Sequence, residues 1–121
     1  MRVMFIIKSG AAAAPTPELM EAMHALATRE IAAGRMLDDG GLTPLDMGAR
    51  ITNARGKVVV VDGPFAESKE VIGGFAVFEA ATRNEALALG MEFMQLHVDY
   101  MPGWDGVMEM REIAGSLTRP V

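Results

Sequence analysis

Apolar and polar positions alternate in short blocks along the first third of the chain. Residues Val3–Ile7 are apolar on both alternating sets of positions, which is typical of a central strand covered on both faces. After a loop of small residues, apolar side chains recur at helical spacing over Leu19–Ile31. Thr16 is placed to cap this helix, Pro17 suits its first position, and Gly34 is a natural stop. The pattern predicts a strand followed by one amphipathic helix.

The middle of the chain contains shorter segments that are expected to form strands. A second strand is expected to begin at Met36-Leu37 and to run into a turn or bulge at Asp38–Gly41. Two further runs, Ala49–Ala54 and Lys57–Val61, flank the dipeptide Arg55-Gly56. Two short runs around a glycine turn predict a β-hairpin.

The last third repeats the strand-helix-strand pattern. Ile72–Glu79 is expected to be a strand, and Thr82–Glu85 has the sequence of a capping box at the start of the second helix. Gly90 falls in the middle of that helix, where glycine costs about 1 kcal/mol relative to alanine, so a close packing contact is expected there. Pro102-Gly103 ends the segment, and Val107–Ile113 is expected to be the last strand.

The predicted order is therefore β-α-β-(β-β)-β-α-β. Two β-α-β halves around a hairpin indicate a ferredoxin-like α+β sheet with both helices on one face. We expect a single domain over residues 1–113 and a C-terminal tail over residues 114–121. Because both helices are expected on one face of the sheet, the apolar residues of the first strand that point to the opposite face also need a cover. A second copy of the chain that packs sheet against sheet is the simplest way to provide it.

Composition narrows the function classes. The chain has 121 residues, half of them hydrophobic, which is enough for one core. Its net charge of −5 argues against a nucleic-acid partner. The absence of cysteine excludes disulfides, zinc–thiolate sites and thiol catalysis. No apolar run has the roughly 18–20 residues of a membrane span, and the N-terminal run is shorter than a signal-peptide core, so a cytoplasmic protein without a membrane partner is expected.

One motif carries a family resemblance. The stretch Asp62-Gly63-Pro64-Phe65-Ala66-Glu67-Ser68-Lys69-Glu70, followed by Gly73-Gly74-Phe75, resembles the DGPF family, a branch of the YCII-related proteins. The resemblance extends over roughly residues 2–113. It implies a ferredoxin-like α+β fold and a homodimer whose two sheets form an α/β barrel.

The functional implications of the resemblance are open. The family has no agreed reaction, but YCII relatives look like small enzymes with a proposed His–Asp pair in a cleft. DGPF proteins are often encoded beside, or fused to, extracytoplasmic-function sigma factors, which hints at a regulatory role. Many relatives carry Ala-Gly-Glu-Gly-Leu after the first helix, whereas this chain has Asp38-Asp39-Gly40-Gly41-Leu42, with glycine at the usual acidic position.

His24 and Asp38 are the candidate catalytic residues. His24 lies one helical turn from Met20 and borders the apolar stripe of the first helix, and YCII relatives place a histidine in this helix. Asp38 follows after the chain has turned back, so the carboxylate could orient the imidazole as a general base. The alternative is an ordinary surface or partly buried histidine.

The candidate ligand-binding residues form two groups. In the motif, Asp62 ends a strand, Phe65 could form an apolar wall, and Lys69 could hold an anionic ligand, with Glu67 in the same charged loop. The alternative is a purely structural turn, because Asp-Gly-Pro is turn chemistry. The second group is a segment at the end of the second helix that could line a pocket or a dimer seam: His97, Tyr100 and Trp104. Helix capping and packing are its alternative roles.

Glu109 and Arg111 alternate on one face of the last strand. They could pair with each other or with symmetry mates inside a barrel and form a polar ligand site, or they could be solvated edge charges. The two histidines lack metal-ligand spacing, so we expect neither a metal nor an organic cofactor. Two functions remain open: a small-molecule enzyme using acid–base chemistry, and a non-catalytic dimer that binds a small ligand or a regulatory protein. A third possibility is a purely structural assembly protein.

Overall fold

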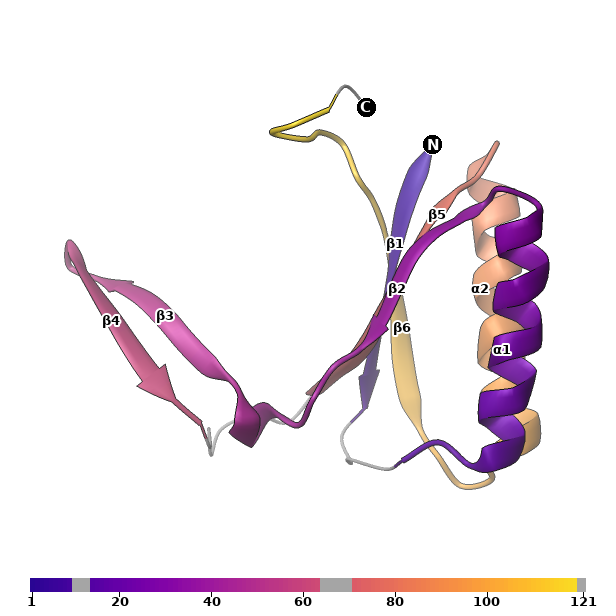
Figure 1. Cartoon of the computed structure of the whole chain (residues 1–121), viewed down its shortest axis with the longest axis horizontal. Helices are drawn as coiled ribbons and strands as arrows, with labels where there is room; N and C mark the ends of the chain where they lie inside the picture. The colour runs from indigo at the N-terminus through magenta and orange to yellow at the C-terminus, as the bar shows by residue number, and fades with distance from the viewer. Residues whose placement is uncertain (10–13, 64–70, 120–121) are drawn as a thin grey trace.

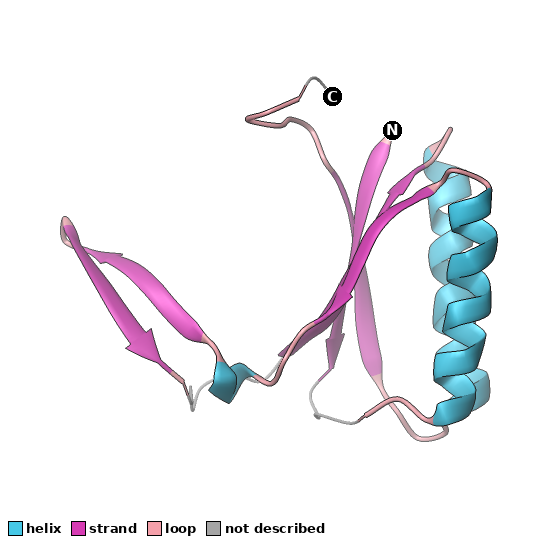
Figure 2. Cartoon of the chain, viewed as in Figure 1, coloured by secondary structure: helices cyan, strands magenta, loops and turns pink. Residues whose placement is uncertain are grey.

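The computed structural model describes residues 1–9, 14–63 and 71–119. Figure 2 shows its strands in magenta and its helices in cyan. They are β1 (Arg2–Ser9), α1 (Pro17–Ala32), β2 (Met36–Gly41), the 3-10 turn η1 (Leu45–Met47), β3 (Ala49–Ala54), β4 (Lys57–Asp62), β5 (Val71–Glu79), α2 (Arg83–Tyr100) and β6 (Gly106–Glu112). The predicted α+β class is confirmed.

Four strands form the main sheet in the order β2-β5-β1-β6, and every neighbouring pair is antiparallel. Both helices lie on the same face of this sheet (Figure 1). This arrangement is compatible with the predicted ferredoxin-like fold. Strands β3 and β4 form a separate two-stranded sheet.

The core lies between the main sheet and the two helices. Val3 and Phe5 of β1 are buried there, and the Phe5 ring meets Phe78 of β5 edge to face with centroids 5.6 Å apart. A Cβ atom at Gly90 of α2 would lie 3.0 Å from Cε1 of Phe5 and 3.1 Å from Cε of Met108. Glycine therefore lets α2 lie close to the sheet, which confirms the contact expected at this position.

Both helices begin at the predicted caps. Thr16 Oγ1 accepts a hydrogen bond from the Leu19 N–H at 3.1 Å, and Thr82 Oγ1 accepts one from Glu85 N–H at 3.1 Å. The Thr16 hydroxyl also donates to the carbonyl oxygen of Tyr100 at 2.7 Å, which ties the start of α1 to the end of α2.

None of the helices in the described ranges is both long and apolar enough to span a bilayer.

The structure corrects the prediction for Asp38–Gly41. These residues do not turn but continue β2, paired with β5 as far as Gly41 opposite Gly74. The only irregularity in this pairing is a register shift between Met36 and Asp38, so the bulge lies one residue earlier than expected. The sequence suggested a turn because of its acidic and glycine residues, but the hydrogen bonds offered by β5 keep the segment extended.

Strands β3 and β4 form an arm that projects from the main sheet (Figure 1). The predicted hairpin is confirmed: Arg55 and Gly56 both have positive φ angles, 54° and 83°, and Asn53 Oδ1 accepts a hydrogen bond from Gly56 N–H. At the base, Gly63 N–H donates to the carbonyl oxygen of Gly48 at 3.0 Å. Every residue of β3 and β4 is exposed.

Candidate functional site

The main sheet has one face that no helix covers (Figure 1). Because Val3 and Phe5 point into the core, the alternate residues of β1 point away from the helices, together with their neighbours on β5. These apolar residues are half-buried: Met4, Ile6, Phe75 and Val77. Together with Lys8, Glu109 and Arg111 we call them the open face. The expectation that the first strand is central is confirmed, because β1 lies between β5 and β6, whereas the cover expected on its second face stays a prediction.

A charged cluster lies beside this apolar row. Lys8 Nζ on β1 forms an ion pair with Glu109 Oε2 on β6, and Arg111 Nη1 lies 3.7 Å from Glu109 Oε1. The hydrogen bond from Lys8 is the main reason that the pKa of Glu109 is lowered, with a smaller contribution from Arg111. Glu109 is therefore a carboxylate at neutral pH.

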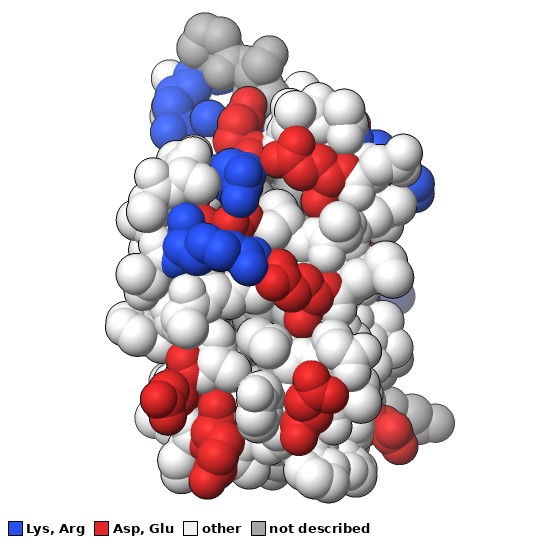
Figure 3. All heavy atoms as spheres, turned by 90° about the vertical axis from the view of Figure 1, so that its right-hand side faces the viewer, with Lys and Arg blue, Asp and Glu red and all other residues white. Residues whose placement is uncertain are grey.

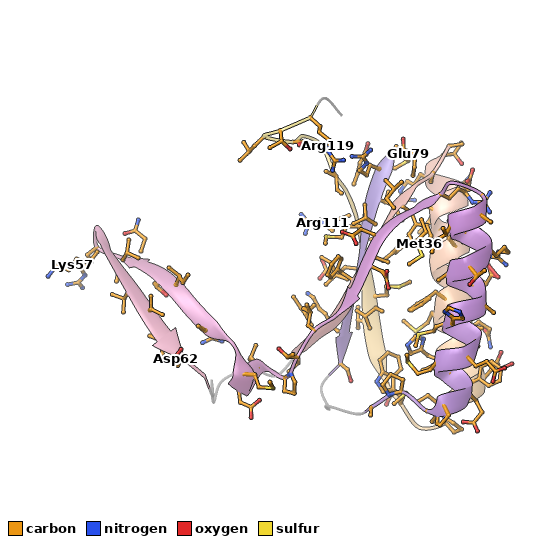
Figure 4. All side chains as sticks on the ribbon, viewed as in Figure 1. Met36, Lys57, Asp62, Glu79, Arg111 and Arg119 are labelled. Atoms are coloured by element: carbon orange, nitrogen blue, oxygen red, sulfur yellow. The ribbon has the colours of Figure 1, made fainter. Side chains whose placement is uncertain are left out.

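Arg111 is the most accessible member of the cluster. Its side chain is 71% exposed and lies on the side of the sheet away from the helices (Figure 4). A guanidinium carries five N–H donors, and a single ion pair at 3.7 Å occupies few of them. Arg111 can therefore bind an additional anionic group.

His97 and Trp104 are brought together, but on the helical side of the sheet. The His97 ring is buried between Phe93 and Trp104, with centroid distances of 5.0 and 4.8 Å. Its Nδ1 lies 3.1 Å from the carbonyl oxygen of Phe93, which can only accept, so Nδ1 carries the proton. Tyr100 is exposed at the end of α2. A ligand-binding role for these residues stays a prediction.

His24 and Asp38 lie on different elements. His24 is exposed on α1, whereas Asp38 is exposed on β2, where its Oδ1 accepts a hydrogen bond from Asp39 N–H. Within the described residues no hydrogen bond or ion pair joins them. Their proposed pairing stays a prediction.

The DGPF-type motif is only partly described. Asp62 is the last residue of β4, paired with Ala49 and exposed at the base of the arm (Figure 4). The candidates Phe65, Glu67 and Lys69 lie outside the described residues.

The sequence did not predict the ion pair of Lys8 or the apolar residues that β5 adds beside Met4 and Ile6. Lys8 directly follows the apolar run Val3–Ile7, and nothing near it in the sequence indicates its partner. Its pairing with β6 depends on the register between β1 and β6, in which Ile6 faces Glu109 and Lys8 faces Val107. The part of the cluster that the sequence did indicate is the alternation of Glu109 and Arg111 along the last strand, which places both side chains on one face.

No group of three or more histidine, aspartate or glutamate side chains in the described ranges is arranged to hold a metal ion.

Comparison with known proteins supports the resemblance seen in the motif. The family model of the YCII-related domain matches residues 1–93. An uncharacterised protein of Rhizobium meliloti (strain 1021) is 33% identical over 69 residues, which are 57% of this chain and 56% of that protein. The matched segment thus spans little more than half the length of that relative. Since the family model covers most of the sequence, the chain belongs to the YCII-related domain family.

Proposed function

We propose that this protein binds a small ligand on the open face of its sheet, as a homodimer in which a second copy covers that face. The observation that carries the proposal is the combination of an apolar floor with the Lys8–Glu109–Arg111 cluster on a surface that its own helices leave bare. Binding sites for small molecules are mostly apolar with a few fixed polar groups. The open face has this composition.

The charges indicate the class of ligand. Lys8 and Glu109 neutralise each other, so Arg111 leaves the cluster with a net positive charge. A guanidinium recognises a carboxylate through paired hydrogen bonds. The proposed ligand is therefore a small carboxylic acid with an apolar body, whose carboxylate contacts Arg111 and whose body lies over Ile6 and Phe75.

The geometry favours binding over acid–base catalysis. Both histidines of the chain lie in the helices, and the carboxylate of Glu109 has a lowered pKa that suits an acceptor rather than a proton donor. The enzymatic alternative through His24 and Asp38 requires a contact between residues of different elements. It is tested separately by His24→Ala, which would abolish turnover of a bound acid but leave its binding intact.

A thermal-shift panel tests the proposed site. Benzoate and octanoate are compared with benzamide and octanamide on the wild type, on Arg111→Gln and on Arg83→Gln, an exposed arginine at the start of α2. A carboxylate at about 100 times its dissociation constant stabilises the fold by about 2.7 kcal/mol. We expect carboxylates to stabilise the wild type and Arg83→Gln, and Arg111→Gln to lose the shift. Equal shifts for all three proteins, or for acids and amides alike, would contradict the site.

A further inference from the structure

Asp38 on β2 borders the open face. Met36, two residues earlier, packs against the core on the helical side and pairs with Phe78. The register shift after Met36 places Asp38 opposite Val77, which belongs to the open face. Residues directly opposite each other in an antiparallel pair point to the same face of the sheet. The exposed carboxylate of Asp38 therefore lies on the same side of the main sheet as Arg111.

Asp38 and Arg111 lie at the two ends of one cross-strand row. Val77 pairs with Met4, and Met4 pairs with Arg111, so the row runs from β2 through β5 and β1 to β6. Neighbouring strands are about 4.8 Å apart, so the Cα atoms at the two ends of the row are separated by about 14 Å. The row thus carries a carboxylate at one end, a guanidinium at the other, and apolar side chains between them.

The acidic end of the row has a second feature that suits a cation. Gly40 follows Asp38 on the same face of β2, and a Cβ atom at Gly40 would lie 2.8 Å from Cε1 of Phe75. The Phe75 ring therefore covers Gly40, on the strand face that carries Asp38. An ammonium group is attracted by a carboxylate and also by the face of an aromatic ring.

The charge of Asp38 is available to a ligand. Its Oδ1 accepts a hydrogen bond from the backbone N–H of Asp39, and among the residues that the structure describes no cation forms an ion pair with it. On the open face itself, Lys8 and Glu109 neutralise each other. Asp38 and Arg111 are therefore the two charges that a ligand on this side of the sheet can complement.

We propose that the ligand of the open face carries an ammonium group as well as a carboxylate, with the two charges at opposite ends of an apolar chain. The carboxylate contacts Arg111, and the ammonium group contacts Asp38 beside the Phe75 ring. An ω-amino acid has this arrangement, whereas an α-amino acid carries both charges on one carbon and cannot reach both ends of the row. The inference rests on the proposed function, to which it adds the amine and a second anchoring residue.

Isothermal titration calorimetry with three ligands of equal carbon number tests the inference: ε-aminocaproate, its isomer leucine, and caproate, which lacks the amine. Charge-assisted hydrogen bonds are strong enough that the wild type should bind ε-aminocaproate about 10-fold more tightly than caproate or leucine. Arg111→Gln should weaken the binding of ε-aminocaproate and caproate alike. Asp38→Asn should weaken only ε-aminocaproate, to the affinity of caproate. The amide oxygen of asparagine can still accept the hydrogen bond from Asp39 N–H, so this variant removes the charge alone.

Asp39→Asn is the matched control. Asp39 is the neighbouring exposed carboxylate, but it pairs with Ala76 and so lies on the helical side of β2. This variant should bind all three ligands as the wild type does. Equal wild-type affinities for ε-aminocaproate and caproate, or equal losses in Asp38→Asn and Asp39→Asn, would overturn the inference and leave the carboxylate site in place. If the wild type binds neither ε-aminocaproate nor caproate, the proposed function fails together with the inference.

Discussion

Arg29 on α1 holds Glu92 on α2 through two parallel hydrogen bonds, from Nη1 to Oε2 at 2.8 Å and from Nη2 to Oε1 at 2.6 Å. Its Nε also donates to Oε2 of Glu30 at 3.2 Å, and Arg35 Nε donates to Oε1 of Glu30 at 2.9 Å. The side chain of Glu30 is fully buried. Figure 3 shows that basic and acidic side chains lie next to one another in the upper half of the helical face. The network joins both helices to the segment that leads into β2.

Replacing Glu30 should weaken the fold. In Glu30→Gln the carboxylate that accepts from two arginines becomes neutral, while both guanidinium groups remain partly in solvent. Hydrogen bonds to charged groups contribute about 1.5–3 kcal/mol, so a loss of about 2 kcal/mol in the free energy of unfolding is expected. Urea denaturation measures it. Glu21→Gln, at an exposed position of the same helix, should change stability by less than about 0.5 kcal/mol.

The same network predicts a pH dependence. Hydrogen bonds from Arg35 lower the pKa of Glu30 below its ordinary value of 4.5, and those from Arg29 lower the pKa of Glu92. A carboxyl group with a lowered pKa in the folded state contributes stability above its unfolded pKa and loses it as pH falls through the folded pKa. The stability difference between the wild type and Glu30→Gln should therefore be full at pH 7 and shrink below about pH 4.5. A difference that stays constant down to pH 2 would show that Glu30 acts through packing alone.

Features set by neighbouring residues were predictable from the sequence. The caps at Thr16 and Thr82, the Arg55-Gly56 hairpin and the contact at Gly90 all follow from local rules and are seen in the structure. The continuation of β2 through Asp38–Gly41 was not, because it depends on pairing with β5.

The residues of the candidate site also divide into those that nearby sequence predicts and those that depend on the pairing of distant strands. The alternation of Glu109 and Arg111 is local and indicated one polar face, whereas the ion pair with Lys8 requires the register between β1 and β6. Sequence periodicity reports which residues share a face of one strand. It does not report which residues of a distant strand lie beside them.

Gly40 and Phe75 should be energetically coupled. The two residues face each other across β2 and β5, and a Cβ atom at position 40 would lie 2.8 Å from Cε1 of Phe75. Gly40→Ala must therefore displace the ring, and overpacking of this kind costs about 1–3 kcal/mol. In a Phe75→Leu background the cost should fall, which a double-mutant cycle of urea denaturations measures as a coupling of at least about 0.5 kcal/mol. If the effects of Gly40→Ala and Phe75→Leu on the free energy of unfolding are additive, the Phe75 ring moves aside without a cost in stability.

Gly106 should control the position of Trp104. A Cβ atom at Gly106 would overlap the Trp104 ring and lie 2.8 Å from the carbonyl oxygen of Lys8, so Gly106→Ala must push the indole off His97 or shift the start of β6. We expect a loss of about 1–3 kcal/mol in the free energy of unfolding. Because Trp104 is the only tryptophan, its fluorescence reports the change directly, and the emission should move to longer wavelength as the indole meets water. Gly115→Ala is the control, since nothing lies within 4 Å of a Cβ atom there, and it should alter neither quantity. Wild-type emission in a destabilised Gly106→Ala protein would place the strain in the backbone of β6 instead of the indole.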